Sequence, residues 1–523
     1  MVSDRKDGLQ SGRVYYTVNL TEWRDELPEE ERGKCRVHKM TLRELLRNIT
    51  ILETGCDMEM EISGVSYDSR KTEPGDLFVA MAGYETDGHR FIPMAREKGA
   101  LCVLCQVKPE GDVPYVLTDD SRGALAQVGR NWYGDPAAGM TMVGVTGTNG
   151  KTTSTLLIKH MLEEKLGAKV GLIGTNANMI GDVELHTERT TPESYELQKL
   201  FADMYEAGCT HVVMEVSSHS LTLDRVAGIK FETGIFTNLT QDHLDFHGTM
   251  AEYAKAKALL FSRTVGAAIN LDDEYSALMV NSATCPVYSF STVNESASLC
   301  AENIKLMPGS VEFTAKDDSG AVDCILHIPG KFSVYNALGV IACGRLLGLS
   351  LEECADALAT AEGVKGRAET VPTDGDYTIL IDYAHTPDAL ENILRTARET
   401  TKGRVVSLFG CGGDRDSKKR PIMGKIGTDL ADFAIITSDN PRTEKPEAIV
   451  ADIVAGVTVE ESRYAVIVDR IKAIEYAIEN HLPGDVIILA GKGHETYQEI
   501  NGVKHHMDER EIVADILERR KER

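Results

Sequence analysis

Residues 141–153 read TMVGVTGTNGKTT, a short apolar run followed by a glycine-rich loop that ends in Gly-Lys-Thr-Thr. The run predicts a buried strand of a parallel sheet, and the apolar spacing after Lys151 predicts a helix. A glycine loop between such elements turns its backbone N–H groups toward phosphates, and the helix dipole adds to the attraction. The stretch therefore predicts a nucleotide-phosphate site made of Gly147, Thr148, Asn149, Gly150, Lys151, Thr152 and Thr153.

Two side chains of this loop have predicted roles of their own. Lys151 can reach the outer phosphates, and the Thr152 hydroxyl is placed to bind Mg²⁺. The general form of the loop has glycine where Val145 stands here, so the glycine spacing departs from that form.

Composition limits the range of functions. The chain has 523 residues, enough for roughly three domains, and its net charge of −25 argues against a general affinity for nucleic acid or anionic membranes. It shows no long apolar run and no charged-then-apolar leader, so we expect a soluble cytoplasmic monomer without membrane insertion. The 11 cysteines include one CxxC, Cys102 and Cys105, inside an apolar strand, which favours core packing over a metal or redox site.

The pattern divides the chain into an extension and three α/β segments. Residues 1–38 lack periodicity and predict an N-terminal extension, partly ordered at best. Residues 39–139 predict a small α/β domain in which Asp68-Ser69-Arg70 could hold a polar ligand or simply form a solvated turn. Residues 140–368 predict a doubly wound, mostly parallel central sheet, and residues 369–523 predict a Rossmann-like α/β domain.

The central segment places polar side chains after its strands. Glu215 ends the strand THVVMEV, where a carboxylate could reach a nucleotide's Mg²⁺. The strand TGIFTN is followed by a dense polar group: Asp242, His243, Asp245 and His247. This group favours metal or phosphate binding. Lys255 and Lys257 come next on a helix, about 200° apart, so at most one of them can face the site.

The third segment repeats this arrangement. Four groups of polar residues follow its strands: Asp382 with His385, the loop at residues 410–415, Asp439 to Arg442, and Gly491 to Glu495. Because parallel strands end at one sheet edge, these groups predict a binding face. The loop GCGGDRD lacks the Gly-Lys-Thr ending, which favours a role other than holding a triphosphate.

The chain resembles the Mur ligases, most closely the MurE type, from about residue 60 to the C-terminus. The resemblance rests on GVTGTNGKTT (144–153), MEVSSH (214–219), NLTQDHLDFHG (238–248), GRAE (366–369), DYAHTPDAL (382–390), FGCGGDRD (409–416), DNPRTEKP (439–446) and AGKGHE (490–495). It implies an ATP-dependent amide ligase in cell-wall peptide synthesis, which phosphorylates a substrate carboxylate before an amine attacks the acyl phosphate. It also implies a UDP-binding domain, a central ATPase domain and a C-terminal amino-acid domain.

The resemblance also implies roles for individual residues. The catalytic set is Lys151, Glu215, His243 and Lys257; of these, Glu215, His243 and Lys257 would organise Mg²⁺ together with Thr152, and Lys257 matches the family's carbamylated lysine. Further ATP contacts would be Asn336, Arg367, Asp382 and His385. Contacts to UDP-N-acetylmuramoyl-L-Ala-D-Glu would be Ser69, Thr190, Thr191, Ser217 and Arg225. Arg189 stands where related enzymes can have Asn, which is a departure in the peptide contact.

The amino acid can be predicted from charge. Members that add meso-diaminopimelate resemble this chain in the DNPR motif, and the Arg442 guanidinium can bind the distal carboxylate that lysine lacks. Glu495 would receive the distal ammonium. The remaining contacts implied by the resemblance are Arg415, Asp439, Asn440, Pro441 and Gly491.

Two other functions stay open at this point. A folylpolyglutamate synthetase would share the central and C-terminal folds, although DSRKTEPGDLF (68–78) and DNPR argue against it. A nucleotide-dependent binding or regulatory protein that has lost ligation is expected to lack His243, Lys257 or Arg442, and all three are present.

Overall fold

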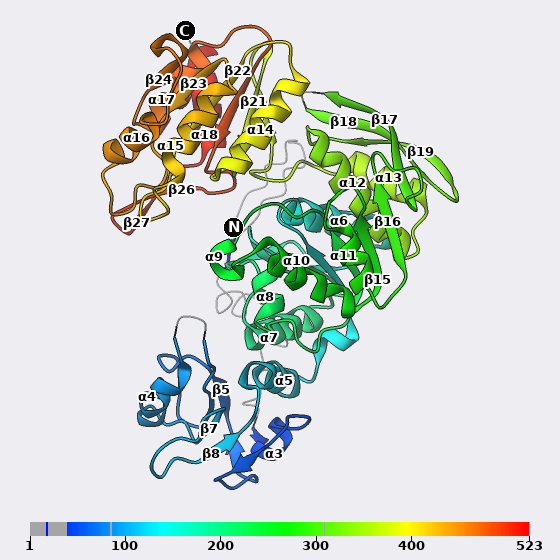
Figure 1. Cartoon of the computed structure of the whole chain (residues 1–523), viewed down its shortest axis with the longest axis vertical. Coiled ribbons are helices and arrows are strands. Elements are labelled where there is room, and N and C mark those ends of the chain that lie inside the picture. The colour runs from blue at the N-terminus through cyan, green and yellow to red at the C-terminus, as the bar shows by residue number, and fades with distance from the viewer. Residues whose placement is uncertain (1–16, 19–38, 84–85, 188, 308, 522–523) are drawn as a thin grey trace, which may run out of the picture. The chain divides into compact units, whose positions relative to one another are not determined.

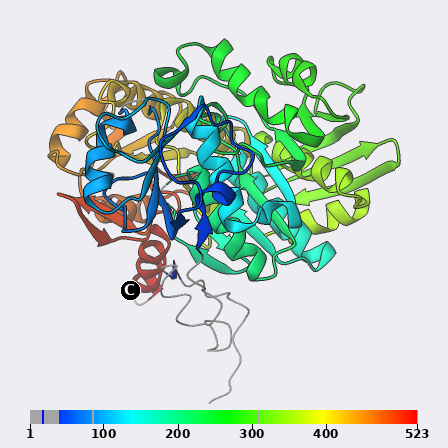
Figure 2. The same ribbon diagram turned by 90° about the horizontal axis from the view of Figure 1, so that it is seen from below.

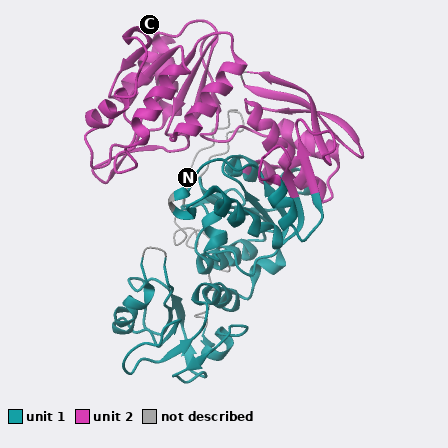
Figure 3. Cartoon of the chain, in the orientation of Figure 1, with its two compact units in different colours: residues 1–155, 162–267, 277–287 teal, residues 156–161, 268–276, 288–523 magenta. Residues whose placement is uncertain are grey.

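The computed structural model describes residues 17–18, 39–83, 86–187, 189–307 and 309–521. The chain divides into two compact units, residues 1–155, 162–267 and 277–287 in one and 156–161, 268–276 and 288–523 in the other (Figure 3). The predicted extension, residues 1–38, lies outside the described residues except for β1 (Thr17–Val18), which pairs in parallel with β12. The three predicted domain boundaries stay predictions.

The first part of the first unit is a small α/β fold, drawn in blue and cyan in Figures 1 and 2. Its sheet has the order β3-β8-β7-β6-β5, and Leu77, Leu104 and Val116 pack on one face. The opposite face of the sheet buries Phe78 and Val103. The elements are β2 (Met40–Thr41), α3 (Leu42–Leu45), β3 (Glu53–Thr54), β4 (Glu61–Ile62), β5 (Gly64–Ser66), β6 (Asp76–Val79), η1 (Gly88–Phe91), α4 (Ile92–Glu97), β7 (Cys102–Cys105), β8 (Tyr115–Leu117) and α5 (Ser121–Tyr133).

The unit continues with strands in the order β12-β11-β10-β13-β9-β14-β15. β9 lies between β13 and β14, both parallel to it, and every residue of β9 after Thr141 is buried, which explains its apolar sequence. The elements are η2 (Pro136–Gly139), β9 (Thr141–Thr146), α6 (Lys151–Leu166), β10 (Val170–Ile173), β11 (Asn178–Ile180), β12 (Val183–Leu185), α7 (Ser194–Glu206), β13 (His211–Glu215), α8 (Ser218–Thr222), β14 (Phe231–Phe236), α9 (Leu244–His247), α10 (Met250–Ala258), η3 (Leu259–Ser262), β15 (Thr264–Asn270) and α11 (Ser276–Ser282).

The second unit begins with strands that the sequence analysis did not predict. β18 pairs antiparallel with both β17 and β19, and their exposed faces carry ion pairs such as Lys316 with Glu302. The elements are β16 (Val287–Ser291), β17 (Leu299–Met307), β18 (Ser310–Asp317), β19 (Gly320–Leu326), α12 (Lys331–Leu346) and α13 (Leu351–Thr360).

The second unit ends in a doubly wound sheet with the order β20-β21-β25-β22-β23-β24, parallel except for β20. α17 and α18 pack with Ile379, Ile487 and Leu408 on one face of it (Figure 1). The elements are β20 (Glu369–Val371), β21 (Tyr377–Asp382), α14 (Pro387–Thr400), β22 (Val405–Phe409), α15 (Lys419–Asp429), β23 (Phe433–Ile436), α16 (Pro446–Val454), η4 (Glu461–Arg463), β24 (Tyr464–Val466), α17 (Arg470–Glu479), β25 (Asp485–Ala490), β26 (Tyr497–Ile500), β27 (Val503–His506) and α18 (Glu509–Lys521).

The predicted fold class, α/β with parallel-rich sheets, is therefore confirmed. The strands β21, β22, β23 and β25 run parallel, so the four predicted polar groups do follow strands that end at one edge. Within the described ranges, no helix has the length and apolar content needed to cross a membrane.

Candidate active site

The glycine loop connects β9 to α6 as predicted. Gly150 caps α6 with φ 84°, in the left-handed region that glycine favours. The loop is held by the segment that follows β14, because Thr148 N donates to Asn238 O at 2.9 Å and Asn149 N donates to the Asn238 side chain. Lys151 Nζ lies over the loop, 3.0 Å from Gly147 O and 2.8 Å from Thr148 O. This geometry is compatible with the predicted phosphate site, in which Lys151 lies directly over the loop.

Gly147 is the tightest point of the loop. A Cβ on Gly147 would lie 1.8 Å from Thr237 Oγ1, so Gly147→Ala must displace the loop. We expect this variant to raise the KM for ATP about tenfold or more, because misplaced phosphate contacts are costly. Gly167→Ala is the matched control, since Gly167 has φ 59° at the other end of α6 but nothing within 4 Å. An equal rise in KM for both variants, measured by phosphate release, would contradict the role given to the loop.

Glu215 forms the acidic part of the site. It is buried at the end of β13, where its Oε1 accepts hydrogen bonds from Thr152 Oγ1 at 2.9 Å and from Thr175 N at 2.8 Å. Thr175 Oγ1 donates to its second oxygen at 3.1 Å. Mg²⁺ prefers oxygen ligands. The Glu215 carboxylate and the hydroxyl of Thr152, at the start of α6, are such ligands, so these two residues fit that cation.

Lys257 and Lys255 point in opposite directions from α10, as the helix-face argument requires. Lys255 is exposed and pairs with Glu252, whereas Lys257 is 1% exposed and donates to Gly147 O at 2.7 Å. Its Nζ also lies 4.4 Å from the centre of the Tyr253 ring. Burial, joined by the charge of Lys151, lowers the pKa of Lys257 well below its ordinary value. Lys257 is thus a buried amine whose charged form is disfavoured, directly beside the glycine loop.

His243 belongs to a cluster of aromatic rings beside the loop. Its backbone is left-handed, with φ 53°, and its ring packs edge-on against His219 with centres 4.8 Å apart. His247 donates to or accepts from Ser218 Oγ at 2.9 Å and stacks on Tyr253. No group of three or more His, Cys, Asp or Glu side chains in the described part of the chain is arranged to hold a metal ion. The predicted Mg²⁺ set, which includes a hydroxyl and a modified lysine, is not of that kind and stays a prediction.

The predicted dipeptide contacts gather beside Glu215. Thr191 Oγ1 donates to Glu215 O at 2.8 Å and lies 3.2 Å from Ser217 Oγ, and Thr190 Oγ1 lies 3.0 Å from Thr175 Oγ1. Arg225 donates to Thr191 O at 3.1 Å and pairs with Glu193, a buried residue that sequence reasoning missed. The exposed Arg189 lies 4.0 Å from the same carboxylate. Ser69 is buried elsewhere, where its Oγ lies 3.3 Å from Met94 Sδ.

The remaining predicted ATP contacts lie in the second unit. Asn336 is buried in α12. Asp382, whose pKa is raised by burial, accepts from Ala368 N at 2.7 Å and from Ala384 N at 2.8 Å. The Arg367 guanidinium lies 5.1 Å from the centre of the Tyr383 ring, and the His385 ring is 4.6 Å from the same ring. Burial lowers the pKa of His385, which favours a neutral imidazole.

Gly366 joins these residues to the loop after β25. Its φ is 71°, and a Cβ there would lie 2.1 Å from His494 N. Gly366 O accepts from Tyr383 N at 2.9 Å. Arg510 closes the contact, because its Nη1 donates to Glu369 Oε2 at 3.0 Å and to Gly493 O at 3.1 Å. The segment that carries Arg367 therefore rests directly on the Gly491–Glu495 loop.

The predicted amino-acid contacts come together at the ends of β23 and β25. Asn440 Nδ2 donates to Glu495 Oε2 at 2.8 Å, and a Cβ on Gly491 would lie 2.5 Å from Asp439 Oδ2. Arg442 has φ 49°, and its Nη1 donates to Gly413 O at 2.9 Å. Arg415 is exposed, and its Nη1 donates to the neighbouring Asp414 O at 3.2 Å.

Of two further residues of this face, Lys492 lies inside the predicted Gly491–Glu495 group without a role of its own, and Glu499 lies outside all the predicted groups. Lys492 is fully buried and donates to Glu495 Oε2 and Asn440 Oδ1, at 2.8 and 2.9 Å. Glu499 pairs with Arg442 Nε at 3.2 Å. Lys492 could be placed at this face from the sequence, because it follows the apolar strand DVIILA within the predicted Gly491–Glu495 group. Glu499 follows no strand and gave no signal.

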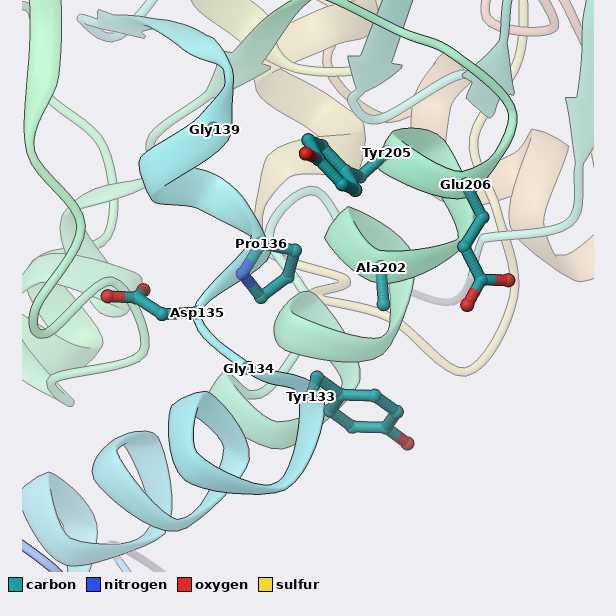
Figure 4. Close-up of a pocket in the computed structure, with 8 residues that line it drawn as sticks. All are labelled: Tyr133, Gly134, Asp135, Pro136, Gly139, Ala202, Tyr205 and Glu206. Atoms are coloured by element: carbon teal, nitrogen blue, oxygen red, sulfur yellow. The ribbon is translucent and has the colours of Figure 1, made fainter. Parts of the chain in front are cut away.

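A pocket of about 250 Å³ is lined by other residues of the first unit (Figure 4). Tyr205 and Glu206 of α7 line it together with Gly134 and Pro136. None of the predicted site residues lines this pocket, so it has no part in the site.

Three family models match the chain: Mur ligase middle domain over residues 145–344, the Mur ligase glutamate ligase domain over 366–493, and the Mur ligase family catalytic domain over 61–133. A Clostridium tetani protein named UDP-N-acetylmuramoyl-L-alanyl-D-glutamate--2,6-diaminopimelate ligase is 46% identical over 486 residues, 92% of this chain and 99% of the relative. A Clostridium acetobutylicum relative of the same name is 47% identical over 91% of this chain and 99% of its own length.

Solved structures agree with these sequence matches. The structure of a ligase of that name is 32% identical, with a TM-score of 0.70, over 92% of this chain and all of the other. The fold also matches that of the Thermotoga maritima MurF ligase in complex with ADP, with a TM-score of 0.59 at 18% identity over 88% of this chain and 97% of the other. The chain belongs to the Mur ligase family of ATP-dependent ligases.

Proposed function

We propose that the protein joins meso-diaminopimelate to the γ-carboxylate of UDP-N-acetylmuramoyl-L-Ala-D-Glu, with ATP converted to ADP and phosphate, in the synthesis of peptidoglycan precursors. The observation that carries this proposal is 46% identity over 99% of a relative named for the reaction. The arrangement of Arg442, Asn440 and Glu495 at one sheet edge supports it, because these side chains offer a cation and a carboxylate to a zwitterionic amino-acid end. We further propose a cytoplasmic monomer.

The chemistry would proceed in two steps. The γ-carboxylate oxygen attacks the terminal phosphorus of ATP, forming an acyl phosphate and releasing ADP. The amine then attacks the acyl carbon, and the resulting tetrahedral intermediate expels phosphate. Lys151 would neutralise charge on the transferring phosphoryl group, while Thr191, Ser217 and Arg225 would hold the dipeptide.

Mg²⁺ would be held by Thr152, Glu215, His243 and a carbamylated Lys257, and it would supply charge neutralisation at the phosphates. Lysine carbamylation adds CO₂ to the neutral amine and releases one proton. Burial and the lowered pKa of Lys257 support this proposal, because both disfavour its protonated form. Asn336, Arg367, Asp382 and His385 would contact the nucleoside and phosphates, and Ser69 would contact the uridine moiety.

One assay tests the proposal. Purified protein receives ATP, Mg²⁺ and UDP-N-acetylmuramoyl-L-Ala-D-Glu, then either meso-diaminopimelate or lysine, while phosphate release and product mass are followed. We expect release and a ligated product with meso-diaminopimelate. No product with either amino acid would refute ligation, and product with lysine alone would refute the specificity. A parallel reaction with a folate and glutamate tests the folylpolyglutamate synthetase alternative.

A further inference from the structure

Arg470 and Glu509 form an ion pair beneath the amino-acid face, and neither side chain is exposed to solvent. Arg470 is the first residue of α17 and Glu509 the first residue of α18, and Arg470 Nε donates to Glu509 Oε1 at 2.8 Å. Neither residue belongs to the contacts proposed above. Their position raises the question of what this buried pair does.

The other nitrogens of Arg470 bind two backbone carbonyls. Nη2 donates to Ala490 O at 2.8 Å, and Nη1 donates to Ser438 O at 3.4 Å. Ala490 directly precedes Gly491, and Ser438 directly precedes Asp439. One guanidinium therefore joins the ends of β25 and β23 at the points where both binding loops begin.

The two loops depend on each other's position. They approach so closely that a Cβ on Gly491 would lie 2.5 Å from Asp439 Oδ2, and Asn440 bonds Glu495 across the gap. Lys492 bonds both Asn440 and Glu495 from beneath. A change in the distance between Ser438 and Ala490 would therefore shift Asn440 relative to Glu495.

The buried ion pair is not expected to contribute much to the free energy of unfolding. The positive charge at the N-terminus of α17 opposes that helix's dipole, the negative charge at the N-terminus of α18 is favoured by its own, and burying an ion pair often costs as much as it gains. Glu509 Oε2 is buried without a hydrogen-bond partner in the described residues, and burial raises the pKa of Glu509. The facing charges, Asp439 and Lys492, belong to the binding loops themselves.

We propose that Arg470 is a positioning residue of the amino-acid site, which sets the spacing of the Asp439–Arg442 and Gly491–Glu495 loops, and that Glu509 holds its guanidinium in place. This inference rests on the proposed function of that face. Arg470 acts only through the two backbone carbonyls and does not touch the substrate.

The test uses the full-length enzyme and three variants. Arg470→Met/Glu509→Met removes both charges with side chains of similar length, which buried pairs often tolerate. We expect the KM for meso-diaminopimelate to rise about tenfold, with the KM for ATP and the thermal midpoint near those of the wild type. Glu509→Gln keeps the carbonyl contacts and should change this KM less than threefold. Arg470→Lys, which can reach at most one carbonyl, should give an intermediate rise.

The matched control is Arg404→Gln. Arg404 pairs with Asp485 at the opposite end of β25, with Nη2 2.7 Å from Oδ2. It is expected to change the thermal midpoint without changing the KM for meso-diaminopimelate. An unchanged KM in the double variant, or equal rises for all substrates, would overturn the positioning role. If the double variant does not fold, an unchanged KM in Arg470→Lys overturns it. Absence of ligation in the wild type would instead refute the proposed function.

Discussion

Lys257→Met is expected to lower kcat for ligation by about 10³-fold, the scale seen when one electrostatic group aimed at a reacting centre is removed. The physical reason is the position of Lys257, buried with its Nζ 2.7 Å from Gly147 O at the start of the phosphate loop. A carbamate on this nitrogen would place a negative charge where Mg²⁺ is proposed to bind, and methionine cannot carry one. The measurement is phosphate release at saturating ATP and amino acid.

Lys255→Met is the control for this prediction. Lys255 lies on the same helix but is exposed and pairs only with Glu252 at the surface, so its loss should leave kcat unchanged. We expect Lys257→Met to fold like the wild type, because an apolar side chain of similar length suits a fully buried position. Wild-type kcat in Lys257→Met would refute the role of this lysine.

Carbamylation itself can be observed. With ¹³C-labelled bicarbonate, the wild type should show a carbamate carbon resonance that is absent in Lys257→Met. In enzyme that carries no carbamate, the lowered pKa of Lys257 means that the folded state holds fewer protons than the unfolded state between that pKa and the ordinary value of about 10.4. This residue's contribution to stability therefore rises with pH through that window, and it opposes folding at lower pH. Lys257→Met should flatten this pH dependence.

Arg442→Ala is expected to lower kcat/KM for meso-diaminopimelate by about 10³- to 10⁴-fold, because sites built around a polar partner lose that much when the pairing is lost. The guanidinium is held by Gly413 O through Nη1 and by Glu499 through Nε, which orients its remaining donors. Arg442→Lys keeps the positive charge but cannot form two parallel hydrogen bonds with a carboxylate. Most of the loss of kcat/KM should therefore remain in this variant. The KM for ATP should change little in both variants.

Lysine as substrate makes this test specific. Lysine lacks the distal carboxylate. In Arg442→Ala, kcat/KM for meso-diaminopimelate should therefore fall much more than kcat/KM for lysine, so the ratio of the two values should fall. Arg395→Ala is a suitable control, since Arg395 is an exposed residue of α14 paired with Glu391. Equal increases in KM for ATP and for the amino acid would count against the assigned role.

The sequence was sufficient for the parts of the fold that depend on local patterns. The apolar run before the glycine loop became β9, and the helix predicted from PDALENILRTARET became α14 with the same bounds. The choice of Lys257 over Lys255 followed from helix geometry alone, and their burial agrees with it. Such features need only neighbours in sequence.

Features that depend on distant residues were not predicted. The strands β17 to β19 are an exception: β17 and the first half of β19 alternate irregularly, but β18 buries every second residue from Val311 to Ala315, a local period that the sequence analysis did not use. Arg470 and Glu509 are 39 residues apart, and only the packing of α17 beside α18 brings them together. Glu193 and Glu499 were recognised only once their partners Arg225 and Arg442 were placed, whereas Lys492 already belonged to a predicted polar group.

The contact at Gly366 implies thermodynamic linkage between two ligands. The segment proposed to bind nucleotide and the loop proposed to bind the amino acid meet there without room for a Cβ, and Arg510 bonds to both. A shift of either segment on ligand binding must be transmitted to the other. Occupancy by nucleotide should therefore change the dissociation constant for the amino acid, and reciprocity requires the amino acid to change the nucleotide's constant by the same factor.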